Sequence, residues 1–336
     1  MESDNSRSIR GSRTGLLSCT AGIRESRKFF GLAHLTQLPD DDEESLEVLL
    51  KLTWTYYGVS ALFNFIVNDE VQCKRYAKKL REEVASTLTQ EDVSYDAKIG
   101  ELYSNDTRES QCHIIKVEVT AQATGRQKRY IYLGYLLQWG PEVSNPPPEG
   151  STRLPLLLCR GNVGATRVVH SVLGMMFDCT VVALPLDPED LCWLLGIMLS
   201  PSAGLPKPKD EVAILDYFVP GLPKNNTVSV SFNVRDLVNL WKSLLKKKDE
   251  VDLEDVEKFY GVLRKQIRKM CNLQLGLCTL FRITLPSLVI SNRQMKITKL
   301  GTVSTILTFL NEKAVDALHF NTSPTTFRDN NSNNNL

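Results

Sequence analysis

The stretch Leu154–Leu199 reads LPLLLCRGNVGATRVVHSVLGMMFDCTVVALPLDPEDLCWLLGIML and contains the longest segments of the chain that are almost free of charge. An apolar run typical of a buried strand leads into Gly161, and a helical pattern follows that turn. A second apolar strand then precedes Asp187-Pro188, an arrangement in which Asp caps a helix and Pro occupies its first turn. The stretch predicts a strand–helix–strand–helix unit that supplies the core.

The turn Gly161–Gly164 lies where a phosphate-binding loop would lie, between a strand and a helix. A P-loop requires Lys and a hydroxyl residue directly after its last glycine, but Gly164 is followed by Ala165-Thr166-Arg167. The G-x-G-x-x-G spacing of dinucleotide-binding folds is also missing. Glycines at such turns commonly serve backbone geometry, although a helix N-terminus flanked by Arg160 and Arg167 attracts anions. We therefore expect a structural turn and keep a nucleotide- or phosphate-handling enzyme as the alternative.

No other pattern in the sequence points to catalysis, a metal or a cofactor. The G-x-S-x-G nucleophile elbow is absent. His170 and Ser171 are adjacent on a predicted helix, so their side chains diverge and cannot form a nucleophile–base pair. The eight cysteines have no metal-ligand spacing, and most lie in apolar runs where the thiol acts as a small hydrophobe. We expect a non-enzyme without metal or cofactor, whose free thiols belong to a reducing compartment.

Composition predicts a globular protein of one large domain or two smaller ones. The chain has 336 residues, of which 42% are hydrophobic and 24% are charged, values that are ordinary for soluble domains. No apolar run reaches the ~18 residues of a membrane helix, and the N-terminus lacks the apolar run of a secretory signal. We expect an intracellular protein that does not span a membrane.

The order of segments predicts four parts of an α+β protein, with a mainly antiparallel mixed sheet flanked by helices. Residues 1–39 are polar and Ser/Gly/Arg-rich and are expected to form a disordered basic arm, and the Asn-rich tail 321–336 is expected to be disordered. Residues 40–145 are expected to form an N-terminal α/β part with an antiparallel meander, and residues 151–320 a C-terminal α/β part that binds a partner. The proline-rich segment Asn145–Gly150 separates the two.

Periodicity separates helices from strands within the N-terminal part. Leu46–Trp54 places apolar residues at helical spacing, so a helix is expected after the acidic run at 40–44. His113–Ala121 alternates apolar and polar residues, as a half-buried strand does. Arg129–Trp139 is apolar on both faces, as a central strand is.

Charge is distributed unevenly along the chain. Residues 40–110 contain 16 acidic and 8 basic residues, whereas residues 258–311 contain nine Lys and Arg and no acid. Two interpretations remain open: the C-terminal half meets an anionic partner, or the two segments neutralise each other inside the molecule.

A helix expected from Asp252 carries part of this basic charge on its exposed face, and three lysines end the helix before it. The candidate DNA-phosphate contacts are Lys246, Lys247, Lys248, Arg264, Lys265, Arg268 and Lys269. Such a patch would contact phosphates rather than bases. A solvated helix face is the alternative interpretation.

Two strand-like runs late in the chain are rich in β-forming residues. A terminal strand can offer its edge to a strand of a partner, and the alternative is an edge that this chain covers itself. The candidate partner-binding residues are Phe281, Ile283, Leu285, Leu288, Val289 and Ile290.

Several short segments occur together in one known family in this order. They are Lys51-Leu52-Thr53-Trp54-Thr55 with Leu62-Phe63-Asn64-Phe65, Leu154–Leu157 before the glycine turn, Phe177-Asp178-Cys179, Trp193, and Leu280-Phe281-Arg282-Ile283. Their order over most of residues 45–318 resembles the centromere protein L family. The N-terminal arm and the Asn-rich tail do not match that family.

The resemblance implies a non-enzymatic subunit of the constitutive centromere-associated network, in the inner kinetochore. It implies a heterodimer with centromere protein N through the C-terminal half, and contact with other inner-kinetochore subunits. It also implies help in binding the centromeric nucleosome and its DNA, and so in chromosome segregation. The implied location is the nucleus, at the centromere and kinetochore of the chromosome. The family supplies no catalytic residues to carry over.

Overall fold

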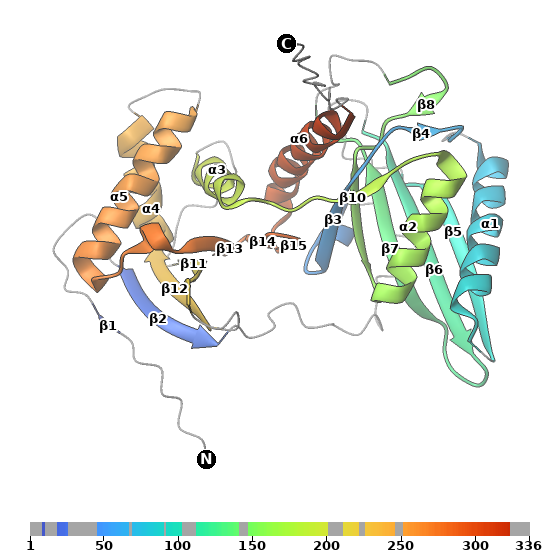
Figure 1. Cartoon of the computed structure of the whole chain (residues 1–336), viewed down its shortest axis with the longest axis horizontal. Coiled ribbons are helices and arrows are strands. Elements are labelled where there is room, and N and C mark those ends of the chain that lie inside the picture. Colours follow the sequence, from blue (N-terminus) through green and yellow to red (C-terminus); the bar gives the residue numbers. More distant parts are fainter. Residues whose placement is uncertain are drawn as a thin grey trace, which may run out of the picture.

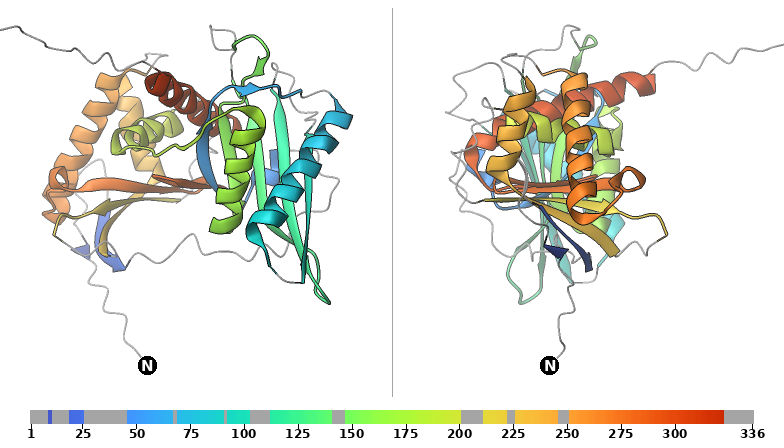
Figure 2. Two further views of the ribbon diagram at one scale, coloured as in Figure 1. Left: turned by 45° about the vertical axis from the view of Figure 1, so that its right-hand side comes forward. Right: turned by 90° about the vertical axis from the view of Figure 1, so that its left-hand side faces the viewer.

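A long antiparallel β-sheet with helices on both faces forms the body of the protein (Figures 1 and 2). The computed structural model describes residues 9–10, 19–25, 46–66, 69–90, 92–102, 112–140, 147–200, 211–221, 226–245 and 251–322. The predicted α+β class is confirmed, since every strand pair of the main sheet is antiparallel and six helices flank it in this part of the chain.

The strands follow one another along the whole chain. In the first half they are β1 (Ile9–Arg10), β2 (Cys19–Glu25), β3 (Thr53–Val59), β4 (Leu62–Phe63), β5 (Val93–Glu101), β6 (Ile114–Ala123), β7 (Arg129–Leu137) and β8 (Ser151–Thr152). In the second half they are β9 (Leu156–Gly161), β10 (Val181–Ala183), β11 (Val212–Phe218), β12 (Asn226–Asn233), β13 (Thr279–Leu285), β14 (Leu288–Ser291) and β15 (Gln294–Ile297).

The helices alternate with groups of strands. They are α1 (Glu70–Leu88), α2 (Val163–Phe177), α3 (Pro188–Leu199), α4 (Val234–Leu245), α5 (Leu253–Cys271) and α6 (Val303–Thr322). The described residues also include the short 3₁₀ helices η1 (Leu46–Leu49), η3 (Leu275–Leu277) and η4 (Leu300–Thr302). No helix of the described residues is both long enough and apolar enough to cross a bilayer.

The strand order is β1-β2-β12-β11-β13-β14-β15-β3-β9-β7-β6-β5. β10 pairs with the end of β3, and β4 pairs separately with β8. The predicted meander is β5-β6-β7, and β11 and β12 form an antiparallel hairpin in the second half. β3, from the expected N-terminal part, pairs with β9 and β15 of the expected C-terminal part, so the sheet is continuous across the proline-rich segment.

The stretch Leu154–Leu199 forms the predicted strand–helix–strand–helix unit, as β9, α2, β10 and α3. Asn162 caps α2, because its side-chain oxygen accepts a hydrogen bond from the N–H of Ala165 at 2.6 Å. At the start of α3 the N–H of Asp187 donates to the carboxylate of Asp190 at 3.1 Å, and Pro188 takes the first helical position. Two local capping signals thus set where both helices begin.

Strand β9 is buried on both faces and separates two cores. Leu156 and Leu158 belong to the larger core, whereas Leu157 and Cys159 belong to the smaller one. Helices α1 and α2 close the smaller core over β5, β6, β7 and β9, and helices α3–α6 close the larger core on the opposite face. The helices therefore change sides along the sheet, which Figure 2 shows in its left-hand view.

This change of sides leaves one face of β11–β15 without a helix above it. Phe218, Thr284 and Val289 lie there and are partly exposed, and no helix of the described residues covers them (Figure 2). Strand registers place the side chains of this face in rows that cross β12, β11, β13, β14 and β15. We call it the open sheet face. It comprises Ile214, Asp216, Phe218, Ser229, Phe281, Arg282, Thr284, Val289, Ser291, Gln294 and Lys296.

The prediction that residues 1–39 are wholly disordered is wrong for residues 9–10 and 19–25, which form β1 and β2. β2 pairs with β12 along its length, and Cys19 and Ala21 enter the larger core. The sequence of β2 is polar with one weakly apolar face, so it gives little local indication of a strand. Its stabilisation comes from pairing with β12, more than 200 residues away. The tail expected to be disordered from residue 321 is also wrong for Asn321 and Thr322, which end α6, and the other residues of the arm and of the tail lie outside the described residues.

The helix expected over Leu46–Trp54 is also wrong. Only Leu46–Leu49 forms a 3₁₀ turn, Lys51 has a φ of 60°, and β3 begins at Thr53. The aromatic and β-branched residues that follow favour a strand, and Trp54 is fully buried between β15 and β9. Tertiary pairing overrides the helical spacing here.

His170 predicts a pH dependence of stability. It packs edge-on against Tyr57 and Tyr132, with ring centroids 4.6 and 5.8 Å away, and its Nε2 is buried without a hydrogen-bond partner in the described structure. Burial lowers the pKa of His170 from 6.5 to about 4. The folded state therefore binds this proton less well than the unfolded state does, so stability is complete above pH 6.5 and is lost as the pH falls towards 4.

Between pH 7 and pH 5 the free energy of unfolding should fall by about 2 kcal/mol through this residue. His170→Phe keeps an aromatic ring between the two tyrosines and cannot titrate. Urea unfolding at both pH values should show a fall in the wild type that exceeds the fall in the variant by this amount. Equal falls in both proteins would show that His170 titrates normally.

Candidate functional site

The glycine turn has the geometry of a helix start and not of a phosphate cradle. A side chain at Gly161 would lie 2.7 Å from the backbone oxygen of Ile131, so glycine is needed for the approach of β9 to β7. A side chain at Gly164 would meet only ordinary contacts, at 3.6 Å or more. The side chain of Asn162 already caps the helix N-terminus.

The two arginines beside this turn do not converge on it. Arg160 lies on the β9 face that carries Leu158, opposite the face on which α2 packs. Burial lowers the pKa of Arg160, and the nearby Tyr135 raises it in part, which fits its place on the larger-core side of the sheet. Arg167 is exposed on α2. The structural interpretation accounts for Gly161 and Asn162, whereas Nη1 of Arg160 is buried without a hydrogen-bond partner in the described structure.

The cysteines are buried or half-buried free thiols. Burial raises the pKa of Cys159 to about 12, and it raises the pKa values of Cys179 and Cys192 to about 11. These thiols stay protonated near neutral pH, which is the unreactive form. No group of three or more His, Cys, Asp and Glu among the described residues is arranged to hold a metal ion.

The late strands do not offer an edge, so that prediction is wrong for this chain. β13 pairs with β11 on one side and with β14 on the other, and β14 also pairs with β15. The alternative of an edge covered within the chain describes the structure. A strand that comes late in the sequence need not lie at the edge of the sheet. Here β3, β9, β7, β6 and β5 follow β15 in the strand order.

The six candidate partner-binding residues divide between the two faces of these strands. Four of them are at most 4% exposed and belong to the larger core: Ile283, Leu285, Leu288 and Ile290. Phe281 and Val289 are half-buried and lie on the open sheet face. Only these two are placed to meet another molecule without unfolding of the strands.

A β-bulge brings two consecutive residues of β13 to the open sheet face. The register shifts where Asp216 faces Arg282 and Tyr217 faces Leu280, so Phe281 is the extra residue. The ring of Phe281 stacks on that of Phe218 with centroids 3.9 Å apart. The guanidinium of Arg282 lies 5.5 Å from the Phe281 ring centroid.

An ion pair fixes Arg282 beside this aromatic pair. Arg282 Nε donates to Asp216 Oδ2 at 2.7 Å, and Ser229 Oγ donates to Asp216 Oδ1 at 2.5 Å. The side chains of Arg282 and Asp216 are 11% and 3% exposed, so the pair is shielded from water by its neighbours. The open sheet face thus combines a fixed ion pair with a stacked aromatic pair, an apolar and polar mixture common at protein interfaces.

The basic residues of α5 form an exposed group at the C-terminal end of that helix. Arg264, Lys265, Arg268 and Lys269 are all exposed, and none of the four makes an ion pair with a described residue. Lys258, one helical turn or more away, pairs with Glu254 at 2.8 Å. The helix dipole at this end favours cations, which is the structural reason for part of the cluster. Lys246, Lys247 and Lys248 lie outside the described residues.

The two oppositely charged segments do not neutralise each other within the part of the chain that the structure describes. Of the basic residues in 258–311, Arg282 pairs with Asp216, Lys299 with Glu211, and Lys258 with Glu254. None of these acids belongs to residues 40–110. The described acids of residues 40–110 that form ion pairs do so with Lys74, Lys78, His113 and Lys128, none of which belongs to residues 258–311.

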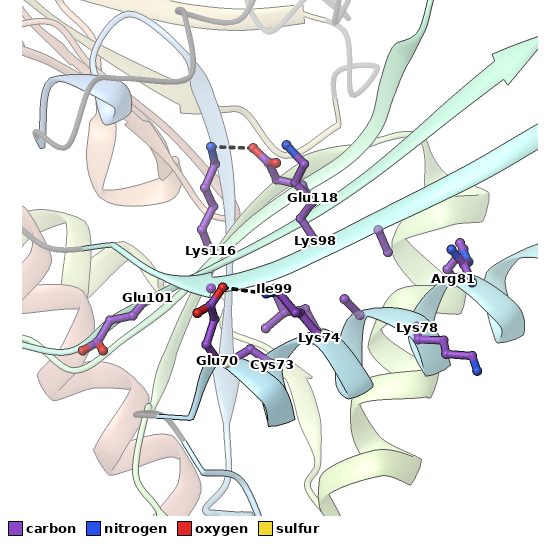
Figure 3. A pocket seen from close by; sticks show the side chains of 13 residues that line it. Glu70, Cys73, Lys74, Lys78, Arg81, Lys98, Ile99, Glu101, Lys116 and Glu118 are labelled. Carbon is purple, nitrogen blue, oxygen red and sulfur yellow. Dashed lines mark ion pairs between the residues drawn. The ribbon is translucent and has the colours of Figure 1, made fainter.

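Sequence reasoning missed a groove at the other end of the sheet, between α1 and the outer strand β5 (Figure 3). Its volume is about 830 Å³, and five basic and three acidic residues line it. They are Lys74, Lys78, Arg81, Lys98, Lys116, Glu70, Glu101 and Glu118. The basic residues of α1 are visible in the sequence, but nothing local indicates that β5 ends the sheet.

Comparison with known proteins identifies a family over most of the chain. A family model described as Centromere protein L matches residues 48–315. Centromere protein L of Gallus gallus is 24% identical over 257 residues, which cover 72% of this chain and 72% of that protein. The proteins of that name in Rattus norvegicus and Homo sapiens are 23% and 22% identical over 264 residues, covering 74% of this chain and 74% of each relative. The matched range runs from η1 into α6, so it includes the smaller core and all of the larger core except Cys19 and Ala21 of β2.

Three substitutions at the glycine turn test its structural role. Gly161→Ala should cost about 1–3 kcal/mol of unfolding free energy because of the overpacking against Ile131, and Asn162→Ala about 1 kcal/mol through the lost cap. Gly164→Ala should be neutral within about 0.5 kcal/mol, since its space is open and alanine favours a helix. Chemical denaturation measures all three. Saturable nucleotide binding that Gly164→Leu abolishes in a folded protein would contradict the structural role.

Proposed function

The chain belongs to the centromere protein L family, and on that premise we propose that it is a non-enzymatic structural subunit of the inner kinetochore. In this proposal it acts in the nucleus, at the centromere, as part of the constitutive centromere-associated network. It pairs with centromere protein N, contacts other inner-kinetochore subunits, and helps to hold the centromeric nucleosome and its DNA for chromosome segregation. The match over residues 48–315 is the observation that carries the proposal.

The open sheet face is the surface we assign to the heterodimer partner. Its stacked Phe218–Phe281 pair and the nearby Val289 are apolar groups without a helix above them in the described structure. Aromatic side chains held in place by their neighbours supply much of the binding energy at interfaces. Ile283, Leu285, Leu288 and Ile290 would support this surface from inside the core and would not touch the partner.

The exposed basic end of α5 is the surface we assign to DNA. Its four cations are not used by ion pairs with described residues, so they are available to phosphates. Contacts of this kind carry no base information and depend on salt. We expect weak DNA binding by the chain alone and stronger binding once the partner adds its own cations.

The enzyme alternative receives no support from the site. The glycine turn is capped by Asn162, and the cysteine thiols with raised pKa values are held in their unreactive form. Relatives across the matched range carry the name of a centromere protein. A structural role is the function that fits these observations together.

Charged residues on the open sheet face should abolish pairing with centromere protein N. Phe281→Glu combined with Val289→Glu would bury two carboxylates in the interface, so affinity should fall by at least about a hundredfold. Co-purification of the two full-length chains, followed by titration calorimetry, measures the change. The thermal unfolding midpoint of the variant alone checks that it still folds.

The matched control is Val163→Glu combined with Met175→Glu. These residues of α2 are 77% and 65% exposed and lie away from the open sheet face. The control should pair like the wild type. Unchanged pairing of the Phe281 and Val289 variant would place the partner on another surface.

Charge reversal on α5 should weaken DNA retention and leave the heterodimer intact. Lys265→Glu with Arg268→Glu removes two phosphate contacts, so the salt dependence of binding should fall by about two units and affinity by roughly tenfold or more. Fluorescence anisotropy on a short duplex, with the heterodimer and at several salt concentrations, measures both quantities.

Arg75→Glu with Lys79→Glu is the matched control, because it changes the net charge equally on the exposed face of α1. An equal loss with this control would mean that only overall charge matters. Loss of pairing in the α5 variant would show that Lys265 and Arg268 belong to the partner interface instead.

A further inference from the structure

We propose that the groove between α1 and β5 is a docking site for an extended acidic segment of a partner protein, which adds to β5 as a further strand. The site lies at the end of the sheet opposite to β1, β2 and β12, away from the open sheet face and α5 (Figure 1). It is therefore independent of the surfaces assigned to the heterodimer partner and to DNA.

β5 is the last strand of the sheet, and half of its backbone groups face outwards. The N–H of Leu102 donates to the oxygen of Ile114, and the N–H of Thr124 to that of Asp92. Because antiparallel pairs alternate, residues with even numbers in β5 bond to β6, and Tyr95, Ala97, Ile99 and Glu101 direct their N–H and C=O groups away from it. No described strand lies on that side. An open edge of this kind is a template for another strand.

Cations stand on both sides of this edge. On one side α1 packs against β5 and presents Lys74, Lys78 and Arg81 at helical spacing along the groove (Figure 3). On the other side Lys98 of β5 and Lys116 of β6 project from the opposite face of the sheet. A strand added to β5 would send alternate side chains towards the two sides, so each set would meet cations.

The acids of the groove are already engaged. Glu70 pairs with Lys74 at 2.7 Å, Glu118 with Lys116 at 2.5 Å, and Glu101 lies 3.3 Å from His113. Lys78 is held only at 4.0 Å by Glu82, and Arg81 and Lys98 make no ion pair with a described residue. The unmatched charge is positive, which selects an acidic occupant over a basic or neutral one.

A second copy of the chain fits the groove less well. Two β5 edges related by a two-fold axis would bring two α1 helices together, with Lys78 and Arg81 of each copy near those of the other. Like charges placed across an interface weaken association. An extended segment with Asp or Glu at alternate positions avoids this repulsion and gains main-chain hydrogen bonds.

The probe is a fluorescein-labelled nine-residue peptide that alternates Glu with Val and Thr, titrated into the full chain. Binding should weaken with salt, and the amides of Tyr95, Ile99 and Glu101 should exchange more slowly with solvent when the peptide is present. Backbone N-methylation of every second peptide residue removes one of the two alternating sets of N–H groups. If the removed set faces β5, binding should weaken roughly tenfold or more, and if the removed set faces away, binding should be unchanged. No binding, or equal effects of both phases, overturns the proposal.

Two variants test the protein side. Ala97→Pro removes an outward N–H, which donates to the carboxylate of Asp96, and keeps every bond to β6. Ala97→Pro should lower the affinity for the peptide roughly tenfold, whereas Ala97→Val should leave the affinity unchanged. Lys78→Glu with Arg81→Glu should weaken it at least as much, while the matched pair Arg75→Glu with Lys79→Glu should have little effect. The unmethylated and methylated peptides keep the test valid if Ala97→Pro folds poorly.

Two further results would contradict the assignment of the occupant. A dimer in sedimentation experiments that Ala97→Pro dissolves would mean that a second copy occupies the edge. A rise in peptide affinity when the acidic run at 40–44 is replaced by serines would mean that this chain covers its own edge. A monomer mass in sedimentation, together with a peptide affinity that the serine replacement at 40–44 leaves unchanged, supports a partner protein as the occupant. None of these readouts uses centromere protein N or DNA, so their failure is separate from failure of the proposed function.

Discussion

The burial of β9 on both faces is the constraint on which the rest of the structure depends. Leu156 and Leu158 must be covered from one side, and Leu157 and Cys159 from the other, and each of the four is at most 1% exposed. One helix layer cannot satisfy both sets of side chains. The chain meets the requirement with α2, which returns over one face directly after the strand, and with α3–α6, which cover the other face further along the sheet. Two cores on opposite sides of one sheet follow from this division.

The same division determines where function can reside. The helices cover opposite faces at the two ends of the sheet, so the open sheet face of β11–β15 has no described helix above it. At its other end the sheet stops at β5, and no described strand pairs with the outer edge of β5. Both assigned protein-binding surfaces are therefore places where the internal packing ends. The bulge at Phe281 and the ion pair of Arg282 with Asp216 make the first surface specific, and the cations of α1 do so for the second. Neither surface needs a cavity suited to a small substrate.

Local patterns predicted the central unit and the meander, because these depend on burial periodicity and, at the start of α3, on the cap at Asp187. They failed where pairing over long sequence distances decides the outcome. β2 is ordered by β12, the helix expected over Leu46–Trp54 gives way to β3 and its pairing with β9 and β15, and β13 becomes interior because β11 and β14 lie beside it. The candidate residues Phe281 and Val289 fall on an accessible face, and the four around them do not. Alternation within a strand separates the two groups, but only the helix positions say which group is covered.

The charge asymmetry of the sequence now has a physical interpretation. Had the acidic and basic segments met across an internal interface, ion pairs would join residues 40–110 to residues 258–311. In the described ranges the pairs are local or go to Asp216 and Glu211. The four exposed cations of α5 and Arg81 of α1 are therefore left to solvent or to other molecules, at opposite ends of the sheet (Figure 1). The sheet keeps the proposed DNA surface and the proposed groove for an acidic segment far enough apart to act independently, since screening in physiological salt limits each field to about 8 Å.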